Sequence, residues 1–383
     1  MTLRGYDRIL IIAIVAILVL GLIMVQSASG PIASEVNGDS LHYVKRQGLA
    51  VIIGLAACLT LAVIPYSWIR QYAWWVYGAV ILALIALMIP GVGREVNGST
   101  RWIGVGGFNL QPSEFAKIAI VVCLGSFVAD NVGRLNDRRV ILKATLIPAP
   151  LLVLVLSQPD FGTTMLLFAL TFILLLVGGL PSKWLIGFVA AAIAAGVPLI
   201  LFASYRWERI KGFLDPWRDA AGSGYQVIQS MVAFQSGGVT GQGLGESHAK
   251  HLFLPEPWTD FVGSVMAEEL GFVGIVVLIS LYCVIVWRGV EVARRAPDMF
   301  GVLLAVTLTC LLGGQAILNF GVVMGVLPPK GLVLPFMSYG GSAVIVHLMA
   351  VGLILNVSAN GRAEAERMLT SYRRAAVAEG VGA

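Results

Sequence analysis

Ten long apolar stretches, nearly free of charged residues, constrain the fold of this chain more than any other feature. A helix needs about 20 apolar residues to cross the hydrocarbon core of a bilayer. The stretches run over residues 9–26, 47–64, 72–89, 115–129, 144–157, 161–180, 184–203, 262–287, 300–326 and 339–357. Charged residues make up only 12% of the chain, against about 25% in soluble domains. The sequence therefore predicts an all-α, polytopic integral membrane protein with about ten transmembrane helices.

Two of these stretches have special features. The first could be a signal peptide, because small residues follow Gln26. We expect it to be retained, since its 18 apolar residues exceed the usual signal-peptide core and an even number of spans then results. The fifth stretch holds Pro148 and Pro150, which predict a kink. The chain reads as one transmembrane domain, residues 1–361, followed by a cytoplasmic tail, residues 362–383.

The distribution of basic residues predicts the orientation. Ten spans place both termini on one side of the membrane, and if that side is cytoplasmic, the inner segments hold 15 of the 26 lysines and arginines and the outer segments hold ten. The inner basic residues cluster in short loops, where the positive-inside rule counts most. We therefore expect both termini in the cytoplasm and two larger segments outside, residues 91–114 and, between the seventh and eighth spans, 204–261. The net charge of +5 does not indicate nucleic-acid binding, because no basic run or face is present.

The first candidate motif lies where the outer segment 91–114 enters the fourth span. Glu114 and Lys117 are spaced i, i+3 and share a helix face, so they can neutralise each other. They form either an ion pair that fastens two helices or, with Arg101 nearby, a site for an anionic headgroup. The motif reads Gln111-Pro112-Ser113-Glu114-Phe115-Ala116-Lys117.

The second and third motifs each place an aspartate just before a span. Asp160 follows Gln158-Pro159 and is either a helix cap or a site residue. Asp260 ends the run Leu254-Pro255-Glu256-Pro257-Trp258-Thr259-Asp260. Burial at such an edge raises a carboxylate's pKa toward that of a general base, although Asp260 could also be an N-cap, with Thr259 as a rival. Glu268 lies eight residues later, roughly on the same helix face.

The fourth motif, residues 327–342, holds three prolines and several glycines between apolar runs. Such a segment cannot form one regular helix, and irregular backbone at membrane depth is tolerated where it lines protein or a cavity. Lys330 is the only charge between Asp298 and Arg362. The glycine-rich residues 237–245 lack the strand and helix context of a phosphate-binding loop.

Together, these four motifs in this order resemble the SEDS family of shape, elongation, division and sporulation proteins, over nearly the whole chain. The run Gly241-Gln242-Gly243-Leu244-Gly245-Glu246-Ser247 and the run Pro329-Lys330-Gly331-Leu332 favour its FtsW-like branch over its RodA-like branch. One departure from the family pattern is Pro257-Trp258, where the family more often has a small residue and a histidine.

The resemblance implies a peptidoglycan glycosyltransferase that polymerises lipid II outside the cytoplasmic (inner) membrane, using lipid II and a lipid-linked glycan strand as substrates. It further implies a class B penicillin-binding protein and other division proteins as partners. The family's essential aspartate falls on Asp260, the expected catalytic base. A divalent cation, magnesium or manganese, could assist, but no ligand set is readable. The expected substrate-binding residues are Arg101, Glu114, Lys117, Asp160, Arg206, Arg209, Lys250, Glu256 and Lys330.

Two other functions remain open from the sequence. A lipid II flippase could use the same charged site, but it would need intramembrane charge along a path through the bilayer. The motif charges instead gather on one side of the predicted membrane. A non-catalytic scaffold of the division machinery would tolerate changes at Asp260.

Overall fold

The computed structural model describes residues 5–96, 99–105, 108–201, 204–222, 224–248 and 256–378. The first half contains α1 (Arg8–Asn37), α2 (His42–Val63), α3 (Tyr66–Gln71), α4 (Ala73–Ala86), β1 (Gly93–Val96), β2 (Ser99–Val105), β3 (Phe108–Leu110), α5 (Pro112–Asp130), α6 (Arg138–Leu146), α7 (Ala149–Ser157) and α8 (Phe161–Val177). The second half contains α9 (Ser182–Leu201), α10 (Ser204–Leu214), the 3₁₀ helix η1 (Pro216–Asp219), α11 (Tyr225–Gly237), α12 (Val262–Arg294), α13 (Met299–Val323) and α14 (Gly341–Ala378).

The helices match the ten predicted spans. Among the described residues, eight helical segments are long and apolar enough to cross a membrane, and α6 with α7 counts as one of them. The shorter apolar helices α4 and α8 coincide with the two remaining stretches. The predicted kink in the fifth span is confirmed, because α6 ends at Leu146 and α7 begins at Ala149.

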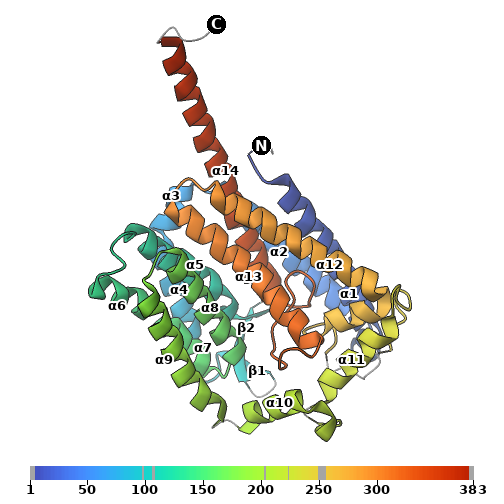
Figure 1. Ribbon diagram of the computed structural model, residues 1–383. Coiled ribbons are helices and arrows are strands. Elements are labelled where there is room, and N and C mark those ends of the chain that lie inside the picture. The colour runs from blue at the N-terminus through green and yellow to red at the C-terminus, as the bar shows by residue number, and fades with distance from the viewer. Residues whose placement is uncertain are drawn as a thin grey trace.

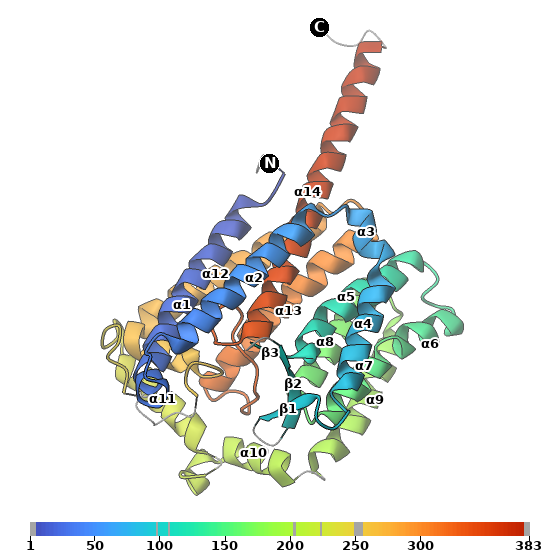
Figure 2. The same ribbon diagram turned by 180° about the vertical axis from the view of Figure 1, so that it is seen from behind.

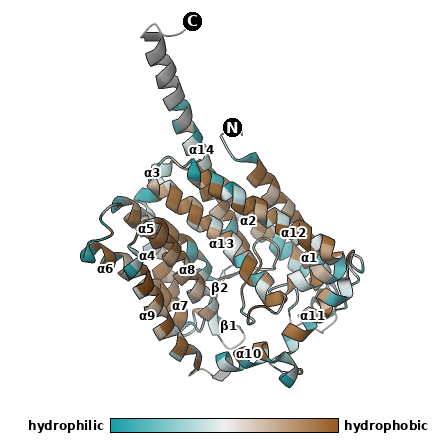
Figure 3. Ribbon diagram, in the orientation of Figure 1, coloured by the Kyte–Doolittle hydropathy of each residue, from teal (hydrophilic) through white to brown (hydrophobic). Residues whose placement is uncertain are grey.

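Helix burial shows where the core of the bundle lies. In α5 and in α14, 83% of the residues in the most apolar 18-residue segment of the helix are buried, against 6% in α9. The helix α14 packs against α2, α12 packs against α13 and α1, and α5 packs against α4 and α8. Large apolar side chains such as Ile12, Trp75 and Ile186 are at least 68% exposed, and apolar residues cover the outside of the helices (Figure 3). Such a surface is stable when lipid covers it.

Both termini lie at one end of the bundle, and the strands and α10 lie at the other end (Figures 1 and 2). This arrangement fits an even number of crossings. The predicted boundary after residue 361 falls within α14, which continues to Ala378 and projects beyond the bundle (Figure 1).

The all-α prediction holds for the bundle but missed a small antiparallel sheet with the order β1-β2-β3. Gly93 pairs with Ile103 on β2, and Ile103 pairs with Leu110 on β3. Strand β2 is rich in residues that favour strands, such as Thr100 and Trp102. Because the segment is short and lies between helices, pairing with itself satisfies its backbone hydrogen bonds.

The helix α12 is broken near its N-terminal end, where Gly271 has φ 64° and ψ −164°. Residues 238–245, here called the glycine strap, pair with the broken turn. The Gln242 and Gly243 amides donate to the carbonyls of residues 268 and 269, and the amides of residues 272 and 273 donate to the carbonyls of 238 and 239, over 2.9–3.1 Å. A Cβ at Gly271 would lie 2.3 Å from the Gly241 nitrogen. The glycines therefore allow the backbones of the strap and of α12 to approach closely. This packing role agrees with the sequence analysis, which argued against a phosphate-binding loop at residues 237–245.

Candidate active site

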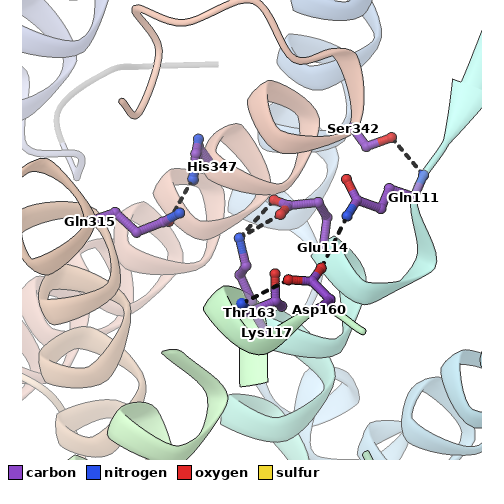
Figure 4. Close-up of polar contacts among 8 residues, drawn as sticks. All are labelled: Gln111, Glu114, Lys117, Asp160, Thr163, Gln315, Ser342 and His347. Atoms are coloured by element: carbon purple, nitrogen blue, oxygen red, sulfur yellow. Dashed lines mark hydrogen bonds and ion pairs between the residues drawn. The ribbon is translucent and has the colours of Figure 1, made fainter. Parts of the chain in front are cut away.

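The four sequence motifs meet at the end of the bundle that carries the sheet. The backbone amide of Gln111 donates to the Ser342 Oγ over 2.9 Å, and the Gln111 side chain donates to the Asp160 carboxylate over 3.4 Å (Figure 4). The Asn319 side chain donates to the carbonyl oxygens of Asp260 and Leu332, each over 2.8 Å. The structure thus joins segments that lie more than 200 residues apart in the sequence.

Glu114 and Lys117 form the ion pair that their spacing predicted. Pro112 starts α5 and Glu114 lies in its first turn, where a carboxylate interacts favourably with the helix dipole. The Lys117 Nζ lies 2.7 and 2.8 Å from the two carboxylate oxygens of Glu114, and the two side chains are 0% and 8% exposed. Two further buried polar residues, His347 and Gln315, bond to each other over 2.9 Å in the same region (Figure 4). The pair neutralises two charges that the bundle core could not hold separately.

Asp160 and Arg101 both stabilise the turn between α7 and α8. Asp160 accepts a hydrogen bond from the Thr163 amide over 3.0 Å and so caps α8. The Arg101 guanidinium donates to the carbonyl oxygens of Gln158 and Pro159, both over 2.8 Å. Of the two roles left open for Asp160, the structure therefore shows the helix cap.

Asp260 behaves differently from Asp160. The N-cap of α12 is Phe261, and no side chain caps that helix. Within the described part of the chain, the Asp260 carboxylate has no hydrogen bond and no ion pair. Its Oδ2 lies 3.6 Å from the position a Cβ would take at Gly331, so the carboxylate faces the broken segment before α14.

The surroundings of Asp260 favour its neutral form. Desolvation by dense packing, and then the nearby charge of Glu256, raise the pKa of Asp260 to about 7, while Arg209 opposes this shift. The residue still keeps part of its surface accessible, so a proton can reach it. A carboxylate with a pKa near neutrality can act as a general base.

Two predicted cations approach this region without an acidic partner among the described residues. Lys330 is part-buried, its Nζ lies 3.7 Å from the Met165 sulfur on α8, and burial lowers its pKa. Arg206 on α10 donates to the Leu199 carbonyl over 2.8 Å and lies over the Phe161 ring at 5.2 Å. Both therefore remain available to an anion near the start of α8.

The remaining predicted residues have more varied surroundings. Glu256 is exposed and has a positive φ of 47°, and Arg209 interacts electrostatically with Asp260. Lys250 lies outside the described residues. Among the residues the structure does describe, no three His, Cys, Asp or Glu side chains are grouped so as to hold a metal ion.

The sequence analysis did not predict the roles of several residues that hold the site together. Glu268, expected on the Asp260 face, accepts hydrogen bonds from Ser247 and from the His248 amide, and Glu269 accepts one from Ser27 on α1. Both acids therefore tie α12 to its neighbours. Asn319 was missed, although it and Gln315 are the only side-chain amides in the ninth apolar stretch, and polar side chains at membrane depth are a usable signal.

An open groove of about 500 Å³ lies between α1 and the glycine strap, and Asp260 is not one of its lining residues. Its lining residues are Ile23, Gln26, Ser27, Gly30, Pro31, Ser34, Ser40, Leu244 and Gly245. Volume alone therefore does not locate the candidate active site, which is defined by the convergence of the four motifs.

Comparison with known proteins supports the resemblance found in the sequence. Residues 8–363 match the family model of the FtsW/RodA/SpoVE cell cycle proteins. The probable peptidoglycan glycosyltransferase FtsW of Trichlorobacter lovleyi is 40% identical over 362 residues, which cover 93% of this chain and 94% of the relative. Stage V sporulation protein E of Bacillus subtilis is 39% identical over 357 residues, covering 93% and 98%.

Solved structures agree with this assignment. A chain of a peptidoglycan synthase complex, studied for its coordination of polymerization and crosslinking, superposes with a TM-score of 0.73 at 32% identity, covering 93% of this chain and 98% of the other. The rod shape determining protein RodA of Thermus thermophilus gives a TM-score of 0.68 at 29% identity, covering 92% and 96%. The chain therefore belongs to the FtsW/RodA/SpoVE family of cell cycle proteins.

Proposed function

We propose that this protein is a peptidoglycan glycosyltransferase that polymerises lipid II into glycan strands, with Asp260 as the general base. The names of the relatives support the enzyme class and the substrate polymer, and the FtsW relatives favour a role in cell division. The observation that carries the proposal is the state of Asp260. Four other motif carboxylates, those of Glu114, Asp160, Glu268 and Glu269, hold the fold. Glu256 is exposed, so Asp260 is the part-buried motif carboxylate without a partner among the described residues.

The reaction assigns a role to each group near Asp260. The acceptor's sugar hydroxyl oxygen forms a bond to the anomeric carbon of the lipid-linked donor, and its proton passes to Asp260. The bond from that carbon to the phosphate oxygen breaks, and the lipid pyrophosphate leaves with the electron pair. Lys330 and Arg206 are the cations best placed to stabilise this charge, because neither has an acidic partner among the described residues. In this proposal Lys117, Glu114, Arg101 and Asp160 position the site, and Arg209 tunes Asp260.

The orientation follows from the distribution of charge. Both termini lie at the end opposite the site (Figure 1), and the basic connectors predicted to be cytoplasmic belong to the terminal end. We therefore place the termini in the cytoplasm and Asp260 on the outer side, where lipid II would be presented. The structural similarity to a chain of a peptidoglycan synthase complex supports a cross-linking partner of the class B penicillin-binding type.

Purified protein incubated with labelled lipid II tests this proposal. Wild type should produce glycan strands on a gel, and Asp260→Asn should produce none while folding normally. Asp215→Asn, a change at an exposed aspartate of the same outer segment, should keep wild-type activity. Strand synthesis by Asp260→Asn would exclude this residue as the base. A protein that makes no strands but moves lipid II between the leaflets of liposomes would be a flippase, and one that does neither would be a scaffold.

A further inference from the structure

Three aromatic rings from distant parts of the chain meet beside Asp260. Tyr43 lies at the start of α2, Trp258 in the turn before α12, and Tyr339 just before α14. The Tyr43 ring centroid lies 4.9 Å from that of Trp258 and 5.2 Å from that of Tyr339, with interplanar angles of 32° and 87°. These separations are typical of favourable aromatic pairs. Tyr43, Trp258 and Tyr339 are here called the aromatic wall.

Hydrogen bonds fix the aromatic wall relative to Asp260. The Tyr339 amide donates to the Trp258 carbonyl over 2.8 Å. The buried Gln47 side chain on α2 donates to the Ser338 carbonyl over 3.0 Å and accepts from the Gly340 amide over 3.1 Å. Because Trp258 precedes Asp260 by only two residues, their Cα atoms are at most about 7 Å apart. The backbone that carries the wall is therefore held at a set position close to the backbone of Asp260.

These rings are more buried than aromatic residues that lie at a membrane–water interface. Interface residues contact lipid and headgroups and are exposed on the protein surface, and Trp75, which is 77% exposed, is of that kind. Trp258 is only 6% exposed, and Tyr43 and Tyr339 are part-buried. Within the aromatic wall, the Trp258 indole is therefore buried, whereas the two tyrosines keep some accessible surface. Arg46 is exposed and its positive charge acts on Tyr339, so it supplies hydrogen-bond donors at the edge of the wall.

The aromatic wall and the cations Lys330 and Arg206 differ in the helices that they contact. Tyr43 of the wall lies on α2, whereas Arg206 and Lys330 contact α8 residues, although Lys330 belongs to the same broken segment as Tyr339. In Figure 2, α2 and α8 lie on different sides of the bundle. A glycosyl transfer brings two sugars to one base, and the donor's departing pyrophosphate requires cations. The donor therefore belongs on the α8 side, which leaves the wall for the second sugar.

We propose that the aromatic wall is the subsite for the acceptor sugar, an inference that rests on the proposed function. A pyranose ring presents a face of C–H groups that packs on aromatic rings, while its hydroxyls bond to polar groups at the rim. Tyr43, Trp258 and Tyr339 would hold this face, and Arg46 and the tyrosine hydroxyls would orient the ring. The attacking hydroxyl would then point toward Asp260, which takes its proton.

The inference can be tested by steady-state kinetics in which one substrate acts only as the donor and another serves as the acceptor. A labelled lipid-linked tetrasaccharide with its terminal 4-hydroxyl blocked acts only as donor, and unlabelled lipid II is the acceptor. Tyr43→Leu keeps an apolar side chain against Trp258 but removes the ring, so we expect the acceptor KM to rise at least tenfold and the donor KM to stay within twofold. Tyr43→Phe, which keeps the ring, should raise the acceptor KM less than threefold. Trp75→Leu is the matched control and should change neither value.

The inference is overturned if Tyr43→Leu leaves the acceptor KM within twofold of wild type, or if the donor KM rises equally. A binding measurement separates this result from failure of the proposed function. Labelled GlcNAc–MurNAc disaccharide is titrated against Asp260→Asn with and without Tyr43→Leu, which requires no turnover. Weaker binding with Tyr43→Leu, by threefold or more, supports the wall even if the protein makes no strands. Equal binding rejects the wall, whatever the activity of the wild-type protein.

Discussion

The buried ion pair of Glu114 and Lys117 can be tested by removing one partner at a time and then both. Lys117→Met leaves a carboxylate in the bundle core, and Glu114→Leu leaves an ammonium group there. Breaking a buried pair in this way typically costs about 3–5 kcal/mol, whereas replacing both partners with apolar groups is often neutral. The two side chains are 0% and 8% exposed, and the Lys117 Nζ lies 2.7 Å from a Glu114 carboxylate oxygen. We therefore expect each single variant to lose about 3–5 kcal/mol of unfolding free energy. The double variant should recover most of it.

The assay is unfolding in mixed micelles of mild and denaturing detergent, followed by tryptophan fluorescence. Lys45→Met is the matched control, because Lys45 pairs with Asp39 over 2.8 Å but with side chains 63% and 40% exposed. It should have little effect on the free energy of unfolding, because exposed ion pairs contribute little to stability.

Activity in the double variant then separates a structural role from substrate binding. A stable double variant that polymerises lipid II would show that the pair holds the helix and does not contact the substrate. A stable but inactive double variant would assign Lys117 or Glu114 to substrate binding, as the family resemblance implies. Single variants that lose less than about 1 kcal/mol of unfolding free energy, as an exposed pair would, would refute the view that the pair compensates two buried charges.

Three further predictions concern the site and its supports. Polymerisation should rise with pH and reach half its plateau near pH 7, because Asp260 must be ionised and its pKa is raised to about 7; Glu256→Gln should move this midpoint to lower pH in a pH–rate profile. Asp260→Asn should raise the free energy of unfolding, and the gain should be about 2 kcal/mol larger at pH 8 than at pH 5.5. The reason is that ionisation of a group whose folded pKa lies above its unfolded value destabilises the fold as the pH rises; an equal gain at both pH values would count against the raised pKa. Gly271→Ala should destabilise the protein by at least about 1–3 kcal/mol in the same unfolding assay, because only glycine readily adopts its backbone angles, whereas Gly196→Ala, at a helical position with open space around it, should be neutral.

Much of the fold followed from local features of the sequence. Spans were predictable because lipid offers no hydrogen bonds, so a crossing segment must be both apolar and helical. The Glu114–Lys117 pair was predictable because helical geometry brings residues three apart onto one face. The kink at Pro148 followed from proline's missing N–H group. The sheet of residues 93–110 was missed because its stability depends on pairing between short strands, which is not a local property.

The roles of the two aspartates show where sequence reasoning stops. Asp160 and Asp260 each precede an apolar span, and the sequence left both as helix caps or site residues. Folding decided between these roles, because Asp160 reaches the Thr163 amide and the Gln111 side chain, whereas Phe261 is the cap of α12 and Asp260 is left without a partner among the described residues. Those outcomes depend on helix directions and on contacts across the whole chain.

The sequence by itself determined that the chain spans a membrane about ten times and carries four polar motifs, since hydrophobicity and helical periodicity are properties of neighbouring residues. Only the tertiary structure decided which charges are already neutralised and which remain for chemistry. The cause is physical, because a buried polar group must find a partner, and its partner comes from whichever segment the fold brings within about 3 Å. For Lys117 that partner is one helical turn away, and for Asp260 the fold supplies none among the described residues.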